Sequence, residues 1–178
     1  MADSFTFNDK ATPKVKTENV KYYYNVGTSS VPSWELQGRG IESWTEEMGA
    51  DIEKKTDVLG FVDMERAVPQ RTQSGVPITI RKGSKFAEKI VEAEYTGDWS
   101  FFDNVEILKK YEFLDGTETS NCKAKLEKEV MMTIVNMTAE AGSYISYEVD
   151  IHYSNNTTLG EMAKVDSESI SFEPKDGA

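Results

Sequence analysis

The sequence predicts a mainly β protein, an antiparallel β-sandwich or barrel with one flanking α-helix. Three observations support this fold class. Most periodic segments alternate apolar and polar residues with the period of two that is typical of strands. One segment, residues 84–97, has the period of a helix instead. Strands and helices do not alternate along the chain, as they would in a parallel α/β fold, so the expected seven or eight strands form antiparallel sheets.

The chain has 178 residues, a length that favours one domain with a single core. Residues 1–18 are polar, contain Pro13 and show no period, so they are expected to form a flexible N-terminal arm. Residues 19–178 are expected to form a single β domain around that core, with a long extended loop or hairpin at about 41–77.

The first half of the chain contains the less regular elements. Residues 19–27, NVKYYYNVG, predict a strand in which Val20, Tyr22, Tyr24 and Val26 share one face. Two strands are expected within residues 34–60, joined by a Gly-Ala-Asp link at 49–51. Pro69, Gly75 and Pro77 then predict a long excursion that ends in a short strand at 78–81.

The second half is more regular. Ser84 can cap a helix that places Phe86, Ile90 and Ala93 on one face and ends at Gly97. Two strands follow, at 104–115 and from 122 onward, with a hairpin turn at Asp115-Gly116 between them. The clearest strand alternates Ile145, Tyr147, Val149, Ile151 and Tyr153 with Ser146, Glu148, Asp150 and His152. A short alternating strand at 167–174 closes the chain.

The charge and composition exclude several classes of protein. A formal net charge of −11 disfavours specific nucleic-acid binding, because phosphate contacts need Lys and Arg. Neither a secretion signal nor a transmembrane span is expected. The single cysteine, Cys122, can form no internal disulfide and has no ligand-spaced partner. We therefore expect a soluble protein made in a reducing compartment.

The sequence contains no recognisable catalytic constellation. His152, the one histidine, is expected to be a polar-face residue of a strand rather than a base or metal ligand. Paired carboxylates such as Glu46-Glu47 arise from composition alone in so acidic a chain. We expect no enzyme, no catalytic residue, no metal site and no cofactor.

The chain resembles the major tail proteins, or tail tube proteins, of long-tailed bacteriophages in the order and composition of several segments, which are spread over most of its length. These are the tyrosine-rich strand NVKYYYNVG, then SWELQGRGIESWTEE and DIEKKTDVLGFVDMERAVPQ, the single helix SKFAEKIVEAEY, two long strands and a TTLGEMA turn.

The resemblance implies a β-sandwich with a flanking helix that forms hexameric rings. The rings stack into a tube whose inner sheets line a channel for DNA passage into the host. The long hairpin and the N-terminal arm reach neighbouring subunits and rings. The candidate interface residues are the apolar side chains of residues 41–75, namely Ile41, Trp44, Met48, Ile52, Phe61 and Val68.

Carboxylates in the channel would repel phosphate and keep the genome mobile. The channel-lining candidates are therefore Ser146, Glu148, Asp150 and His152. A second possible lumen row, Lys123, Lys125, Glu127 and Glu129, is less suited to this role because of its lysines. The resemblance further implies tape-measure, terminator and tail-tip or baseplate proteins as partners, DNA in transit without specific binding, no membrane insertion, and a place in the virion tail after assembly in the bacterial cytoplasm.

Three alternatives stay open. One is the inner tube of a contractile tail or phage-derived bacteriocin. Another is a β-sandwich module that binds carbohydrate or acts as an adhesin, although Trp34, Trp44 and Trp99 share no period. The third, a hydrolase, is disfavoured by the lone histidine.

Overall fold

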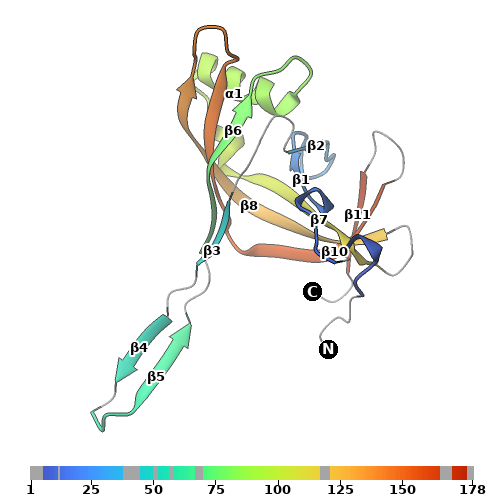
Figure 1. Cartoon of the computed structure of the whole chain (residues 1–178). Helices are drawn as coiled ribbons and strands as arrows, with labels where there is room; N and C mark the ends of the chain where they lie inside the picture. Colours follow the sequence, from blue (N-terminus) through green and yellow to red (C-terminus); the bar gives the residue numbers. More distant parts are fainter. Residues whose placement is uncertain are drawn as a thin grey trace.

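The structure, a computed structural model, describes residues 6–11, 13–37, 45–49, 52–56, 58–66, 70–116, 121–164 and 170–175. In this part of the chain the predicted fold class is confirmed: antiparallel strands dominate, with one α-helix (Figure 1). The strands are β1 Val20–Asn25, β2 Trp34–Leu36, β3 Glu46–Gly49, β4 Ile52–Thr56, β5 Val62–Arg66, β6 Gln70–Thr79, β7 Val105–Asp115, β8 Asn121–Thr138, β9 Ser146–His152, β10 Asn156–Lys164 and β11 Ile170–Pro174. The helix α1 spans Lys85–Thr96, and the short 3₁₀ turns are η1 Asp9–Ala11, η2 Thr17–Asn19 and η3 Ser100–Asp103.

The longest strand, β8, joins the two halves of the main sheet. The strand order is β2-β1-β7-β8-β9-β6-β3, and β10, outside this order, pairs with both β8 and β11. The first part of β8 lies between β7 and β10, whereas its last part, Met131–Thr138, pairs with β9. Glu129 and Asn155 have positive φ angles of 54° and 66° where this ribbon changes partner. The hydroxyl of Ser154 donates a 2.7 Å hydrogen bond to the Lys128 carbonyl at the same place.

One buried cluster contains side chains from both halves of the sheet and from α1. Its members include Tyr22 and Tyr24 of β1, Val105 and Ile107 of β7, Val76 and Ile78 of β6, Val149 and Ile151 of β9, and Phe86 and Ile90 of α1. Burying one such large apolar side chain contributes about 1.5 to 3 kcal/mol, so this cluster is the main source of stability. The cluster is continuous across β8, because Val130 and Met132 belong to it as well.

The predicted helix is confirmed in its ends and in its buried face. The Ser84 hydroxyl accepts a 3.1 Å hydrogen bond from the Ala87 N–H, and Gly97 ends the helix in the left-handed conformation with φ 75°. Phe86, Ile90 and Ala93 are buried, as their spacing predicts. No helix in the described part of the chain is long and apolar enough to cross a membrane.

The predicted number of strands was too low, because the described residues alone contain eleven strands. The excursion expected up to residue 77 contains β5 and most of β6. Gly75 lies in a bulge of β6 between Gln73 and Val76. Pro77 is tolerated in β6 because it lies beyond the described residues of β3, so that among the described strands β6 pairs there with β9 alone. The TTLGEMA segment was expected to be a turn but lies in β10, paired residue by residue with β8. The residues of the TTLGEMA segment alone do not indicate that β8 lies beside it.

A long antiparallel hairpin leaves the body at one end of β6. Glu46 of β3 is opposite Gln73 of β6, and further out Ile52 of β4 is opposite Arg66 of β5. Figure 1 shows β4 and β5 extending away from the rest of the chain, whereas the other end of β6 leads towards α1. The hairpin and α1 therefore lie towards opposite ends of β6.

Candidate functional site

The half-sheet β8–β9–β6–β3 has one face on the core and one open face. The alternation of β9 is confirmed: Tyr147, Val149 and Ile151 are buried, whereas the four channel-lining candidates lie on the other face. Their registered neighbours on β6 are Thr72, Pro77 and Thr79, and those on β8 are Met131, Thr133, Asn136 and Thr138. None of these described residues is a lysine or arginine. The open face thus carries carboxylates without a cation in register with them.

Two of the channel-lining candidates also make structural contacts. Asn136 donates a 2.9 Å hydrogen bond to the carboxylate of Glu148 across β8 and β9. The N–H of Gly75 donates a 2.7 Å hydrogen bond to Asp150, at the bulge where Gly75 has φ 64°. Asp150 therefore supports the local shape of β6. His152 is exposed at the end of β9.

The candidate interface residues are less completely described. Met48 lies on β3 and is exposed, and Ile52 lies on β4. Phe61 lies between β4 and β5 and is 69% exposed, as are Val58 at 102% and Leu59 at 77%. Ile41, Trp44 and Val68 lie outside the described residues. We call Val58, Leu59 and Phe61 the hairpin tip.

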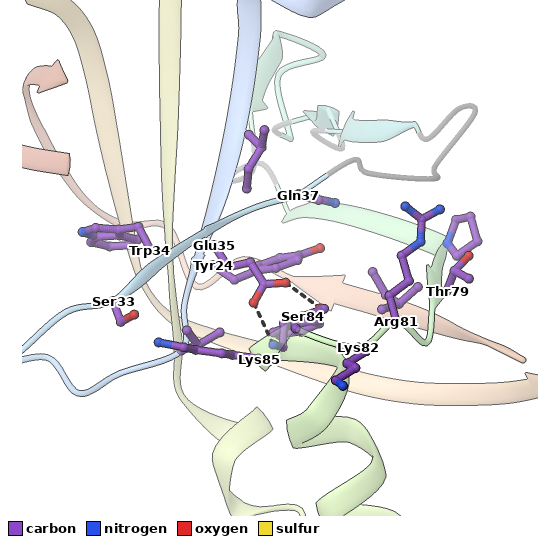
Figure 2. Close-up of a pocket in the computed structure, with 16 residues that line it drawn as sticks. Tyr24, Ser33, Trp34, Glu35, Gln37, Thr79, Arg81, Lys82, Ser84 and Lys85 are labelled. Carbon is purple, nitrogen blue, oxygen red and sulfur yellow. Dashed lines mark hydrogen bonds between the residues drawn. The ribbon is translucent and has the colours of Figure 1, made fainter. Parts of the chain in front are cut away.

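A groove of about 880 Å³ lies between β2, the end of β6 and the N-terminus of α1. We call it the α1 groove (Figure 2). Its lining includes the apolar side chains of Trp34, Leu36, Ile78 and Phe86 and the charged side chains of Arg81, Lys82 and Lys85. The groove's one acidic residue, Glu35, accepts hydrogen bonds from the Ser84 hydroxyl at 2.5 Å and from the Phe86 N–H at 3.0 Å.

Two buried polar atoms of the α1 groove have no hydrogen-bond partner among the described residues. They are the hydroxyl of Tyr24 and Oε1 of Gln37, which belong to side chains on the groove wall (Figure 2). Leaving a buried polar group unpaired costs about 1 to 3 kcal/mol, so such atoms are uncommon. Both atoms are buried beneath the groove, and the two other such atoms, Nε2 of Gln73 and the hydroxyl of Tyr153, lie outside its lining.

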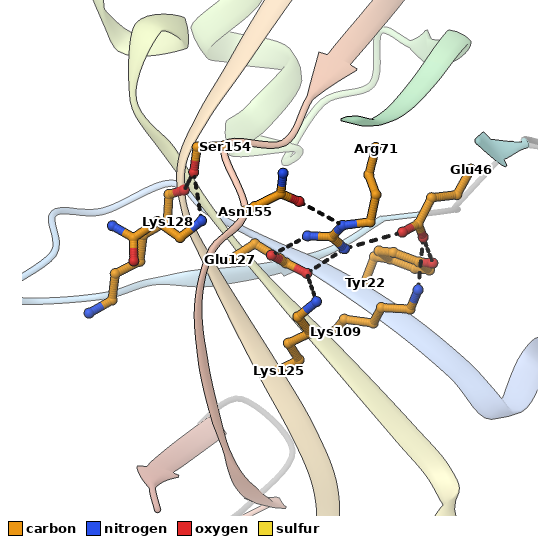
Figure 3. Close-up of polar contacts among 10 residues, drawn as sticks. Tyr22, Glu46, Arg71, Lys109, Lys125, Glu127, Lys128, Ser154 and Asn155 are labelled. Carbon is orange, nitrogen blue, oxygen red and sulfur yellow. Dashed lines mark hydrogen bonds and ion pairs between the residues drawn. The ribbon is translucent and has the colours of Figure 1, made fainter. Parts of the chain in front are cut away.

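A buried network of charges ties the base of the hairpin to the body (Figure 3). Arg71 of β6 donates to both carboxylate oxygens of Glu127 of β8, at 2.7 and 2.6 Å, and lies 3.4 Å from Glu46 of β3. Lys109 of β7 binds Glu46 at 2.8 Å, and Lys125 binds Glu127 at 3.0 Å. Glu127 is only 1% exposed. The network therefore joins four strands at the point where the hairpin begins.

Both charge signs are stabilised within this network. Burial alone would raise the pKa of Glu46, but hydrogen bonds from Lys109 and Tyr22 lower it below its usual range. Burial raises the pKa of the Tyr22 hydroxyl, and its hydrogen bond to Glu46 raises it further. The guanidinium of Arg71 loses hydration by burial, but the hydrogen bond with Glu127 raises its pKa overall. At neutral pH Glu46 therefore stays a carboxylate, Tyr22 stays a neutral phenol and Arg71 stays a cation.

The alternative lumen row was wrong for its two central residues. Lys125 and Glu127 belong to the buried network, and Lys123 binds Glu161 of β10 at 2.8 Å. Glu129 alone in this row is exposed, at the bend of β8. These residues therefore do not form an open face.

Part of the predicted N-terminal arm lies against the end of β7. Phe7 forms an isolated bridge with Leu114, and the Asn8 N–H donates a 3.1 Å hydrogen bond to the Phe113 carbonyl. Lys10 of the arm and Lys21 of β1 bind the two oxygens of Glu112, at 2.9 and 2.8 Å. The flexibility of residues 1–18 in solution stays a prediction.

The Glu112 site predicts a pH dependence of arm docking. Burial would raise the pKa of Glu112, but hydrogen bonds from Lys21 and Lys10 outweigh it and lower the pKa to about 2. Because the pKa is lower in the folded chain, the stabilisation is present above the ordinary value near 4.5 and is lost as the pH falls towards 2. The protection factors of the amides of residues 6–11, which correct for the slower intrinsic exchange in acid, should fall in this window.

The variant E112Q should remove this part of the pH dependence and speed exchange of the arm at neutral pH as well. The matched control is E18Q, since Glu18 does not contact Glu112 and its ion pair with Lys16, at 3.7 Å, is exposed. Equal exchange of the arm in E112Q and the unchanged protein would contradict the docking role of Glu112.

The comparisons with known proteins show the fold. No protein-family model and no curated protein matches the chain. Among solved structures, it is similar to a chain of the sheath–tube complex of an extracellular contractile injection system, PVC, in the extended state. The TM-score is 0.52 at 9% identity, over 86% of this chain and 95% of that one. A chain of the PVC sheath/tube terminator in the extended state gives a TM-score of 0.52 at 7% identity, over 84% of this chain and 98% of that one.

A further similarity, to a chain of the anti-feeding prophage baseplate, has a TM-score of 0.41 at 5% identity, over 79% of this chain and 89% of that one, and carries no argument. The chain thus has the fold found in components of contractile injection systems. The predicted resemblance to tail tube proteins is confirmed at the level of the fold. Membership of the major tail protein family of long-tailed bacteriophages stays a prediction.

Two groups of residues were missed by the sequence reasoning. Lys109 alternates with Val105, Ile107, Tyr111 and Phe113 in the sequence, and its charge among these apolar residues was the one local signal of a buried ion pair. The α1 groove combines residues 24–37 with residues 77–86, and no local pattern connects these two segments.

Proposed function

We propose that this chain is a structural subunit of a tube, in which copies join side by side into rings and the rings stack around a channel. The observation that carries the proposal is the open face of β8–β9–β6–β3. It presents Glu148 and Asp150, has no lysine or arginine in register with them, and belongs to a sheet whose other face is packed on the core. The role is mechanical and needs no catalytic residue.

The two edges of this half-sheet support lateral assembly. Among the described residues, Met131–Thr138 of β8 pair with β9 alone, and β3 pairs with β6 alone. An open edge exposes unpaired backbone groups and tends to pair with another strand. Exposed Met131 and Met137 lie on the β8 edge, and exposed Met48 lies on β3 at the other side. Pairing of unlike edges is a heterologous contact that closes into a ring when the rotation allows it.

A channel lined by the β9 face suits DNA as cargo. Carboxylates repel phosphate, so DNA would slide without the contacts that lysine and arginine make. Hexameric rings, a tape-measure protein, a terminator and a baseplate or tail tip complete this proposal, with a location in the tail of a virion or injection particle. The fold shared with the PVC sheath–tube chain favours the contractile form, in which a sheath surrounds the tube.

Electron microscopy of the purified protein tests the proposal. We expect rings or tubes with a central channel when the protein is concentrated, and single subunits when it is dilute. A chain that stays monomeric at every concentration, and also in the presence of a tail-tip complex, would overturn the proposal.

Cysteine labelling tests whether the open face of β9 lines the channel. In a Cys122→Ser background, His152→Cys should react with a bulky maleimide–polyethylene glycol in the monomer and be protected in tubes. The matched control is Tyr95→Cys, on the exposed side of α1, which should react in both states. Equal labelling of His152→Cys in monomers and tubes would show that this face does not line the channel.

A further inference from the structure

Four buried side-chain atoms in the interior have no hydrogen-bond partner among the described residues. They are the hydroxyls of Tyr24 and Tyr153, Oε1 of Gln37 and Nε2 of Gln73. All four residues are more than nine-tenths buried. Native proteins leave few such atoms unpaired, because a polar group that leaves water without gaining a new hydrogen bond destabilises the fold. A group of four therefore needs an explanation.

The strand register brings these residues together in two pairs. Gln37 is a diagonal neighbour of Tyr24, because its N–H bonds at 2.8 Å to the carbonyl two residues before Tyr24. Tyr153 is a diagonal neighbour of Gln73 in the same way, through a 3.0 Å bond to the carbonyl two residues before Gln73. Diagonal neighbours on antiparallel strands lie on the same face, within reach of long side chains.

Two further relations connect the pairs. The Gln37 amide donates a 3.5 Å hydrogen bond to the amide oxygen of Gln73. Tyr24 and Tyr153 belong to the same buried cluster, and Tyr24 is close enough to raise the pKa of the Tyr153 hydroxyl electrostatically. The four side chains therefore form one polar group between β1–β2 and β6–β9.

The unpaired atoms do not depend on which way the two amides are turned. Turning both amides over exchanges their oxygen and nitrogen atoms, so that Gln73 becomes the donor of the amide pair. Because one contact joins the two amides, one amide donor and one amide acceptor still have no partner. The group thus needs a partner that donates and accepts hydrogen bonds in either arrangement.

The chemistry of the group defines its ligand. Amides and phenols are neutral, and burial raises the pKa of both tyrosine hydroxyls, so no charged ligand is required. Water is the smallest neutral molecule that can donate two hydrogen bonds and accept two. Buried water molecules in proteins make about three hydrogen bonds to polar atoms of this kind.

We propose that Tyr24, Gln37, Gln73 and Tyr153 line a buried hydration site, in which ordered water molecules join β1–β2 to β6–β9. Tyr24 and Gln37 also line the α1 groove, which gives the site a route to solvent (Figure 2). The site lies next to the charge network, because the guanidinium of Arg71 is 4.7 Å from the centre of the Tyr153 ring. The proposal concerns the single subunit and does not depend on tube assembly.

An experimental structure at a resolution that shows ordered water tests the site directly, either by crystallography of the monomer or by electron microscopy of tubes. We expect a water molecule within hydrogen-bonding distance of at least two of the four atoms. A structure in which the four atoms bond to one another or to other protein groups, or in which no water lies between them, would overturn the proposal.

The variants Tyr24→Phe and Tyr153→Phe give a second readout. Each removes a hydroxyl and keeps the ring, which stacks on Phe86 in one case and faces Arg71 in the other. If water binds the hydroxyl, the urea midpoint of unfolding should fall by about 0.5 M. An unchanged or higher midpoint in both variants would mean that the hydroxyls bind no water and would contradict the site. The matched control is Tyr144→Phe, which should keep the midpoint because Tyr144 is 81% exposed.

Discussion

Replacing Arg71 by methionine (R71M) is expected to lower the free energy of unfolding by about 3 kcal/mol, near the lower end of the range for breaking a buried ion pair. Arg71 donates to both oxygens of Glu127, which is 1% exposed. Without Arg71, this buried carboxylate keeps only Lys125, at 3.0 Å, and its lost hydrogen bonds are not replaced by water. Equilibrium unfolding in urea measures the loss.

The cause of this loss can be separated from the loss of packing. In the double variant R71M/E127L the uncompensated charge is gone, so most of the stability should return. The matched control is K89M, because Lys89 forms an exposed pair with Glu92 on α1 and such pairs contribute about 0.5 kcal/mol or less. If R71M and K89M lower the stability equally, the network does not stabilise the fold.

The network also predicts where R71M loosens the chain. Glu46 of β3 and Arg71 of β6 lie at the base of the hairpin, and both contact the body through charged partners. Hydrogen exchange in R71M should therefore accelerate at the amides of β3 while those of α1 stay protected. The network would then be the element that fixes the direction of the hairpin.

The sequence predicted the elements whose signals are local. The cap at Ser84, the buried face through Ile90 and the end at Gly97 all lie within α1, so its position could be read directly. The alternation of β9 likewise placed Val149 on the core and Glu148 on the open face.

The elements that were missed depend on distant partners. β10 is a strand because Thr157 to Ala163 find β8 beside them, although Gly160 within it suggested a turn. Lys109 and Glu127 are buried because Glu46 and Arg71, far away in the sequence, neutralise them. The α1 groove needs two chain segments that meet only in the folded protein. The alternation of the four β9 candidates could be predicted because one strand contains them all, and their place in a channel stays a prediction.

Placing lysines on the open edge of β8 (M131K/M137K) is expected to abolish tube formation and leave the monomer folded. Both methionines are about half exposed, at 51% and 53%, so their replacement should change the free energy of unfolding by about 1 kcal/mol or less. Lysine on an edge strand opposes pairing with another chain, because its charge would have to be desolvated at the new interface. Sedimentation of concentrated protein, followed by microscopy of the pellet, measures assembly.

The control for this variant is Y95K, which adds a lysine at an exposed aromatic residue of α1, outside the strands of the sheet. It should sediment as the unchanged protein does. The same edge substitutions should leave the dilute monomer's urea transition nearly unchanged, which separates a lost contact between copies from a lost fold. Normal tubes from M131K/M137K would mean that β8 is not the lateral edge. The ring contact would then have to involve β2 or β11, the outer strands of the other half of the sheet, and the acidic face of β9 would no longer be continuous from one copy to the next.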